Sequence, residues 1–196
     1  TYNGVAILSH HRIHDVVRGF DGDPEDAEKR VIGAEVEGFA ILDLYVPNGK
    51  EVGHKSYHYK LEWLKQLRTF LDTHYQPTDP VVVCGDFNIT FDDRDIHDPE
   101  AWHERILCST PERDALRHVM DFGLIDGLRR YEEDRGPFTW WDHRGGSLAR
   151  DRGLRIDHFL LSEAALARCT GIRVDREMRK GPSPSDHAPV IAEFDD

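Results

Sequence analysis

The sequence predicts a layered α/β or α+β domain, and three of its features carry that prediction. Segments with the two-residue alternation of β-strands recur along the chain, two stretches with helical spacing lie between them, and most connections are short without any internal repeat. Strands and helices that alternate in this way pack as layers around a common core. The 196 residues allow a sizeable core and contain no linker, so we expect one domain over residues 1–196.

Strands are expected where β-branched and aliphatic residues alternate, because successive side chains of a strand face opposite sides of the sheet. The expected strands are Val5–Ser9, Val31–Val36, Phe39–Val46, Val81–Asp86, Phe138–Trp141, Leu154–Leu161, Gly171–Val174 and Pro189–Phe194.

Two helices are expected from apolar residues spaced three and four apart. In Tyr57–His74 the leucines line one face, with Trp63 beside them as a core residue, and in Pro111–Phe122 the apolar residues also face inward. The inward residues are Leu61, Leu64, Leu67 and Leu71 in the first helix and Leu116, Val119 and Met120 in the second. The polar stretch Phe91–His103 is expected to be a surface loop.

The cysteines, the apolar runs and the opening residues indicate in which cell compartment the protein resides. The three cysteines, Cys84, Cys108 and Cys169, form no CxxC pair, which indicates neither a disulfide framework nor a zinc site. No apolar run approaches the ~20 residues of a membrane span. The opening residues lack the basic-then-apolar order of a signal peptide. We expect a cytoplasmic protein that does not associate with membranes.

The formal net charge of −12 by itself argues against a polyanionic partner. The acidity is uneven, however, with 19 acidic and 10 basic residues in 1–100 but 18 and 15 in 101–196. The arginine-rich segment Arg135–Arg155 holds five arginines and only two aspartates, and it includes Trp140 and Trp141. Arginine binds phosphate bidentately and indoles stack on bases, so this segment is a candidate nucleic-acid contact. A solvated loop is the alternative.

The strongest local signal is the apolar run Val81-Val82-Val83-Cys84, which ends in Gly85-Asp86-Phe87-Asn88. Residues two apart on an extended segment point the same way, and strand ends place such side chains in open crevices. The side chains of Asp86 and Asn88 could therefore contact the same metal ion and the same water molecule. A Gly-Asp pair after a strand is also ordinary turn chemistry.

A second signal is Ser183-Pro184-Ser185-Asp186-His187-Ala188-Pro189, where two prolines restrict an acid and an imidazole. A third is Asp157, which falls inside an apolar strand where a carboxylate is costly to bury unless it is paired. We expect His187 as its partner, because an Asp–His pair fixes the imidazole tautomer. Neighbouring backbone groups or Arg155 are the alternative partners.

Six segments occur in the order found in the exonuclease III family of abasic-site endonucleases, within the larger endonuclease/exonuclease/phosphatase group, and the chain resembles that family over nearly its whole length. They are Tyr2-Asn3-Gly4-Val5-Ala6-Ile7-Leu8-Ser9, Leu44-Tyr45-Val46-Pro47-Asn48-Gly49, Gly85-Asp86-Phe87-Asn88-Ile89, Phe138-Thr139-Trp140-Trp141-Asp142, Arg152-Gly153-Leu154-Arg155-Ile156-Asp157 and Ser185-Asp186-His187-Ala188-Pro189. The resemblance implies a four-layered α/β/β/α sandwich of two packed mixed sheets flanked by helices, with the active site at one end of the sheets.

The resemblance also implies residue roles. Asp86 would orient or deprotonate the attacking water, Asn88 would hold that water and the phosphate, and Tyr45 would contact the scissile phosphate. His187, oriented by Asp157, would donate to a phosphate oxygen. The metal, Mg²⁺ or Mn²⁺, would be held within the set Asp86, Asn88, Asp186 and His187, whose carboxylate and amide oxygens are ligands that magnesium prefers.

The substrate implied by the resemblance is double-stranded DNA with an abasic or 3′-blocked site, cut by a monomer with associated 3′-to-5′ exonuclease activity. Trp140, Leu154 and Ile156 would line a small apolar pocket for a flipped-out baseless sugar. Asn48, Arg150 and Arg152 would be further DNA contacts. The competing hypothesis is a non-catalytic nucleic-acid-binding regulator, but such relatives lose the acid and the amide that stand here at Asp86 and Asn88.

The chain departs from the family at its start. The family has an N-terminal segment with an asparagine and a metal-binding glutamate, and this sequence begins after them, so we expect a truncated domain with an incomplete metal site. A short N-terminal strand is the plain alternative. His54 and His58 stand four apart, but Lys55 occupies the place of a metalloprotease glutamate, so we interpret them as surface residues, like His97 and His103.

Overall fold

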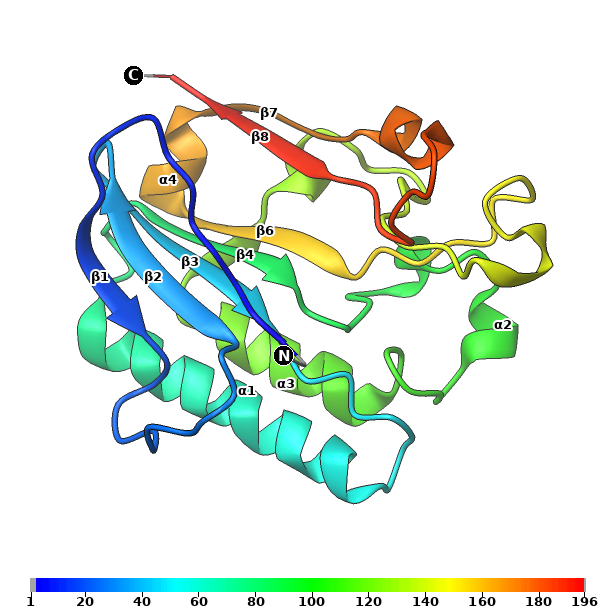
Figure 1. The fold of residues 1–196 in the computed structure, drawn as a ribbon, viewed down its shortest axis with the longest axis horizontal. Helices are drawn as coiled ribbons and strands as arrows, with labels where there is room; N and C mark the ends of the chain where they lie inside the picture. The colour runs from blue at the N-terminus through cyan, green and yellow to red at the C-terminus, as the bar shows by residue number, and fades with distance from the viewer. Residues whose placement is uncertain (1–2, 196) are drawn as a thin grey trace.

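The computed structural model describes residues 3–195, so Thr1, Asp196 and Tyr2, the first residue of the first family-like segment, lie outside it. A six-stranded mixed sheet forms the centre, in the order β1-β2-β3-β4-β6-β5, and β7 and β8 form a second, antiparallel sheet (Figure 1). The strands are β1 (His14–Arg18), β2 (Val31–Val36), β3 (Phe39–Tyr45), β4 (Val81–Asp86), β5 (Leu124–Asp126), β6 (Asp157–Ser162), β7 (Cys169–Val174) and β8 (Val190–Phe194).

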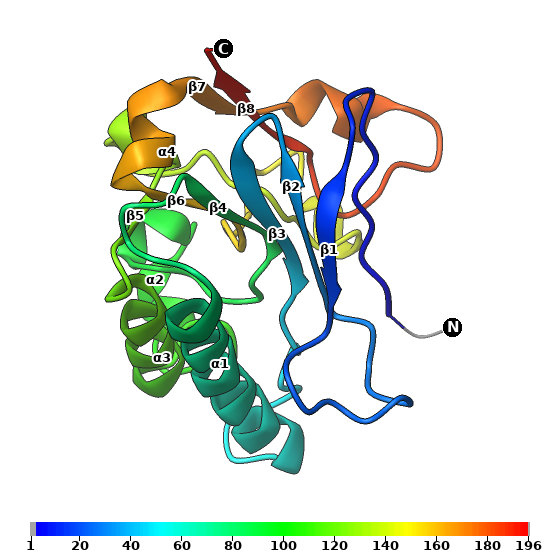
Figure 2. The same ribbon diagram turned by 90° about the vertical axis from the view of Figure 1, so that its left-hand side faces the viewer.

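Helices α1 (Lys55–His74) and α3 (Thr110–Met120) lie side by side on one face of the central sheet (Figure 2). Both expected helices are confirmed, with ends that differ by one or two residues. α1 begins where His54 caps it, since the backbone N–H of Ser56 donates to His54 Nδ1 at 3.0 Å. The shorter helices are η1 (Asp93–Asp95), α2 (Pro99–Trp102), η2 (Leu128–Arg130), η3 (Arg144–Gly146), α4 (Glu163–Arg168) and η4 (Arg176–Lys180).

Two apolar clusters, one on each face of the central sheet, show how the layers pack. On the helix side the inward residues of β3 and β4 contact the leucine stripe of α1, in which Trp63 is buried as expected. On the other side Val82 and Leu161 pack against Ile172 of β7, with Ala165 of α4 at the edge. The predicted class, two packed sheets flanked by helices, is confirmed.

Two expected strands are wrong. Val5–Ser9 pairs with no strand of the described residues, and Leu8 is 94% exposed. Phe138–Trp141 forms only single bridges, from Trp140 to Leu154 and to His187. An alternating pattern sorts side chains between two faces, but a strand also needs a neighbour whose backbone groups continue the ladder.

Other segments also differ from the expectation. The strand expected at Leu154–Leu161 begins at Asp157, because the residues before it bond to Asp95 and to the Thr139–Trp140 segment instead. The stretch Phe91–His103 holds two short helices and buries Asp95 completely, so it is more than a surface loop. Strands β1 and β5 and helix α4 were not expected, because β1 is almost entirely exposed and has no apolar alternation, and β5 and α4 are too short to show a period. No helix in residues 3–195 is long and apolar enough to cross a membrane.

Candidate active site

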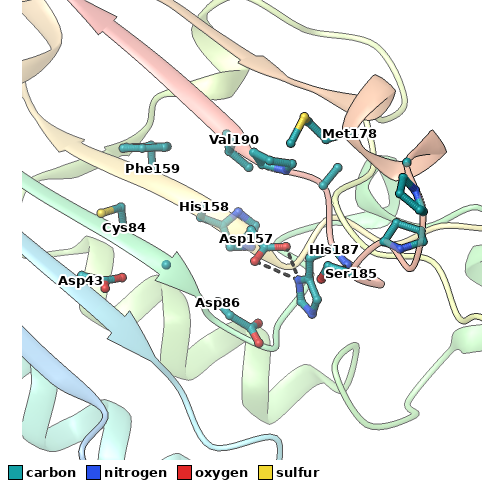
Figure 3. Close-up of a pocket in the computed structure, with 16 residues that line it drawn as sticks. Asp43, Cys84, Asp86, Asp157, His158, Phe159, Met178, Ser185, His187 and Val190 are labelled. Carbon is teal, nitrogen blue, oxygen red and sulfur yellow. Dashed lines mark hydrogen bonds and ion pairs between the residues drawn. The ribbon is translucent and has the colours of Figure 1, made fainter. Parts of the chain in front are cut away.

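Three neighbouring strands bring three of the expected site residues into one row. Tyr45 of β3 is the register partner of Asp86 at the end of β4, and Asp86 is in turn the partner of Asp157 at the start of β6. Gly85 permits this arrangement, because its φ is +127° and a Cβ there would overlap the backbone of Leu44. Figure 3 shows Asp86 and Asp157 on the same side of the sheet.

Asp86 and Asn88 form one hydrogen-bonded unit. The backbone N–H of Asn88 donates to Asp86 Oδ1 at 2.8 Å, and Asn88 Nδ2 donates to Asp86 Oδ2 at 2.9 Å. Asn88 Oδ1 accepts from Asn48 Nδ2 at 2.8 Å, which joins the loop after β3 to the loop after β4. Asn88 has a φ of +50°, a left-handed conformation that asparagine tolerates better than most residues.

Asp157 pairs with His187, as expected from the sequence. His187 Nδ1 lies 2.9 Å from Asp157 Oδ2 and 3.1 Å from Oδ1, and its other ring nitrogen is free of the carboxylate (Figure 3). Asp157 is itself fixed, because its backbone N–H donates to the buried Thr139 Oγ1 at 3.1 Å. The alternative partner, Arg155, is completely buried and pairs with Asp95 and Asp126 instead.

The electrostatics of these groups differ. Burial and the neighbouring carboxylate of Asp157 raise the pKa of Asp86 to about 7. Burial acts to lower the pKa of His187, but its pairing with Asp157 outweighs this and raises that pKa to about 9. At neutral pH the site therefore holds a charged imidazolium beside a carboxyl group poised between its two protonation states.

Asp186 is held by the neighbouring tryptophan. Trp140 Nε1 donates to Asp186 Oδ2 at 2.9 Å, and the backbone N–H of Trp141 donates to the carbonyl of Asp186 at 3.0 Å. Burial acts to raise the pKa of Asp186, but the indole hydrogen bond and His187 lower it overall. The carboxylate therefore stays ionised, and its loop is attached to the Phe138–Trp141 segment.

The row of residues opens into a cleft of about 720 Å³ between the central sheet and the loop before β8. Asp86, Asp157 and His187 line it, and the same three border an adjoining depression of about 400 Å³ that Tyr45 lines. Asn88 and Asp186 line neither part of the cleft; Asn88 is hydrogen-bonded to Asp86, and Asp186 accepts from Trp140. The structure thus brings together the residues that we expected to share a site, although they are spread over half the sequence.

Two nearby residues were missed by the sequence analysis. Asp43 lines both parts of the cleft, and the signal for it was its position two residues before Tyr45 on the same strand face. Arg30 lies with its guanidinium 4.7 Å from the centre of the Tyr45 ring and donates to the Tyr45 carbonyl at 3.1 Å. Arg30 lies just before β2 and far from Tyr45 in the sequence, so no local pattern marks it.

The expected DNA contacts separate into two groups. Asn48, Arg150 and Arg152 are exposed, and Trp140 is partly exposed, so these four can reach a ligand. Leu154 and Ile156 are 0% and 2% exposed and pack with the core beneath Trp140. In this structure their side chains are turned inward, because their backbone is held against Trp140 and Thr139, and their place in the wall of a sugar pocket stays a prediction.

The arginine-rich segment is also of mixed character. Arg155 is completely buried and pairs with Asp95 and Asp126, at 2.7 and 2.5 Å. Arg135 donates to the carbonyl of Ile96 at 2.9 Å. These two arginines bind the chain to itself, which leaves the exposed arginines between them for a phosphate backbone.

The expected metal-binding residues can be compared with the ligands that Mg²⁺ requires. In residues 3–195 no group of three or more His, Cys, Asp or Glu side chains is placed to hold a metal ion together. Mg²⁺ does not require such a cage, because it commonly keeps several waters and binds one or two carboxylates together with substrate phosphates. Asp86 lines the cleft and Asp186 directly precedes His187, so these are the carboxylates of the expected set that such an ion could use. Two members of the expected set fit less well, because the Asn88 amide is used in hydrogen bonds and His187 is protonated at neutral pH.

Two packed sheets flanked by helices, with two aspartates and a charged imidazole in an open cleft, define a layered α/β enzyme with a site suited to phosphodiester hydrolysis. Residues 1–187 match the Endonuclease/Exonuclease/phosphatase family, and the chain belongs to that family. It is 32% identical to exodeoxyribonuclease III of Haemophilus influenzae, over 97% of this chain and 76% of that protein. The resemblance to the exonuclease III type is thereby confirmed.

Solved structures agree. The 3′ phosphatase NExo from Neisseria, solved bound to a product DNA hairpin, has a TM-score of 0.90 and 40% identity, over 95% of this chain and 73% of that one. An AP endonuclease from Archaeoglobus fulgidus has a TM-score of 0.90 and 31% identity, with the same two coverages.

Proposed function

We propose that the protein is a magnesium-dependent phosphodiesterase of DNA base-excision repair, which cuts the backbone at abasic sites and has associated 3′-to-5′ exonuclease activity. The observation that carries this proposal is the Asp86 carboxyl group facing the Asp157–His187 ion pair in an open cleft. Relatives named as exodeoxyribonuclease III, AP endonuclease and 3′ phosphatase support DNA as the substrate.

Four side chains of the cleft region have separate roles in the proposed reaction. Asp86, in its ionised form, orients the attacking water and accepts its proton, since a group with a pKa of about 7 suits a general base at neutral pH. The free ring nitrogen of His187 donates to a non-bridging phosphate oxygen as negative charge develops there. Tyr45 contacts the same phosphate from the adjoining depression, and Asn88 keeps the Asp86 carboxylate in one orientation.

Asp86 and Asp186 would hold Mg²⁺, with Mn²⁺ as an alternative of similar ligand preference. The bound ion supplies positive charge that neutralises the phosphate during in-line displacement. Trp140 fixes the orientation of Asp186, because its indole N–H donates to one carboxylate oxygen and leaves the other oxygen for the metal.

Duplex DNA is the partner that the exposed surface favours. Arg150 and Arg152 would hold the phosphate backbone, and Trp140 would stack beside the damaged nucleotide. We propose that the protein acts as a monomer in the cytoplasm. Cys84, Cys108 and Cys169 are all free thiols, which fits a reducing compartment.

The direct test is cleavage of a duplex carrying one abasic-site analogue by the full-length protein, with Mg²⁺ or with a chelator. We expect a nick at the abasic site only with the metal, and a loss of at least about 100-fold in rate for Asp86→Asn, in line with loss of a general base. A protein that binds the duplex tightly but leaves it intact would instead be the non-catalytic regulator, and the proposed function would be wrong.

A further inference from the structure

A completely buried lysine lies beneath the candidate active site and takes no part in the proposed chemistry. Lys60, on α1, has no exposed surface, and neither has its partner Glu112 on α3. An isolated ammonium group in the interior is costly, and an apolar pair of similar size is often as stable as a buried ion pair. A gain in stability therefore does not explain why a lysine occupies this position.

The contacts of Lys60 lead to the site. Its ammonium group has three N–H donors, and the structure provides three acceptors. Lys60 Nζ donates to the carbonyl of Asn88 at 2.7 Å, to the carbonyl of Asn48 at 3.2 Å and to Glu112 Oε1 at 2.5 Å. Two of the three acceptors are thus the backbone carbonyls of the residues whose side chains join above Asp86.

These two carbonyls belong to loops that have left the sheet. Asn48 follows β3 and Asn88 follows β4, so the regular ladder does not supply their donors. Asn88 also has a φ of +50°, a conformation that persists only where its surroundings hold it. Gly49 packs closely on Lys60, since a Cβ at Gly49 would lie 3.3 Å from Lys60 Cδ. The ammonium group is the common point to which both loops are bound.

The other side of the network is rigid. Glu112 Oε2 accepts from the backbone N–H and hydroxyl of Ser109 at 3.1 and 2.7 Å, and Glu112 Oε1 also accepts from the backbone N–H of Leu107. Ser109 in turn is hydrogen-bonded to Tyr57 at 2.8 Å, one turn before Lys60 on α1. The lysine is therefore fixed by two helices on one side and holds two loops on the other.

We propose that Lys60 is a positioning residue, which fixes Asn48 and Asn88 through their backbone carbonyls and thereby fixes the Asp86 carboxylate. Its effect on catalysis rests on the proposed function, but its effect on the two loops does not. If Lys60 only stabilised the fold, another variant that weakens the same hydrogen-bond network would change the two loops and the activity in the same way.

The experiment compares Lys60→Met, which removes the contacts to both carbonyls, with Tyr57→Phe, which removes the hydrogen bond to Ser109 and leaves the carbonyls untouched. NMR spectra of the folded proteins report the side-chain amide groups of Asn48 and Asn88. We expect those signals to shift and to lose protection in Lys60→Met and to stay unchanged in Tyr57→Phe. Lys60→Met/Glu112→Met, which replaces the buried pair by an apolar one, covers the case in which the single variant does not fold.

Kinetics give the second readout. A displacement of about 1 Å in a positioning group costs about 100-fold in rate, so we expect kcat to fall by about that factor in Lys60→Met with KM changed less than about threefold. Tyr57→Phe should keep kcat within about twofold when both variants are assayed well below their melting temperatures. Asparagine signals that stay unchanged in a folded lysine variant would overturn the proposal. An inactive wild-type protein would refute the proposed function alone, because the NMR comparison decides the role of Lys60 without it.

Discussion

Replacing Asp157 with asparagine tests the electrostatic account of the site, because it removes one negative charge and keeps the shape of the side chain. The pairing holds the pKa of His187 at about 9, against an ordinary 6.5. That difference of about 2.5 units corresponds to about 3.4 kcal/mol between the two protonation states. At pH 7.5 the protonated fraction would fall from about 97% to about 9%, a loss of roughly tenfold in the active form.

The measurement is an NMR titration of the His187 ring in the metal-free protein, compared between wild type and Asp157→Asn. We expect midpoints near 9 and near or below 6.5. In cleavage assays the deficit of the variant should shrink by about tenfold between pH 7.5 and pH 5.5, because acid restores the imidazolium in the variant. A wild-type midpoint near 6.5, or a deficit independent of pH, would refute the reasoning.

The same shift has a consequence for stability. The pKa of His187 is higher in the folded protein than in the unfolded one, so its contribution to the free energy of unfolding is complete below about pH 6.5 and is lost as pH rises through about 9. The melting temperature of the wild type should therefore fall over this window more than that of Asp157→Asn. Parallel melting curves across the window would contradict the assignment.

Three further predictions concern the frame and the DNA surface. Arg155→Met removes the ion-pair partner of the buried Asp126 and one of the two arginines paired with Asp95, so it should lower the free energy of unfolding by about 3–5 kcal/mol in urea, whereas the exposed Arg152→Met should change it by less than about 0.5 kcal/mol. Gly85→Ala should cost at least about 2 kcal/mol in the same assay, because an L-residue is strained at that φ and its Cβ meets the backbone of Leu44; a neutral result would mean that β4 can move aside. Replacing Arg150 and Arg152 together with alanine should reduce the log–log salt slope of duplex binding by about two units while preference for the abasic site persists; an unchanged slope would place both side chains away from the DNA.

Much of the fold could be predicted because its signals are local. The alternation in Val31–Val36 and Val81–Asp86 gave both strands with the bounds that the structure has, and the leucine spacing of α1 gave its buried face. Val5–Ser9 has a similar alternation but forms no strand, because the ladder depends on a neighbour that no local pattern specifies.

Part of the site could also be predicted. The cost of burying Asp157 called for a partner, and the only rigidly placed imidazole among the family-like segments, His187, is that partner. The direction of Leu154 and Ile156 could not be predicted, because it depends on backbone bonds to Thr139 and Trp140 that close only when distant segments meet.

The sequence by itself therefore determined the layered α/β class, the Asp86–Asn88 unit and the Asp157–His187 pair, because residue type, spacing and the cost of burying charge act locally. Only the tertiary structure decided what surrounds these groups. The register of β3, β4 and β6 placed Tyr45, Asp86 and Asp157 in one row, and the packing of α1 beneath the loops brought Lys60 under the site. The physical reason is that strand register and helix packing follow from the complementarity of whole surfaces, which no stretch of sequence contains alone.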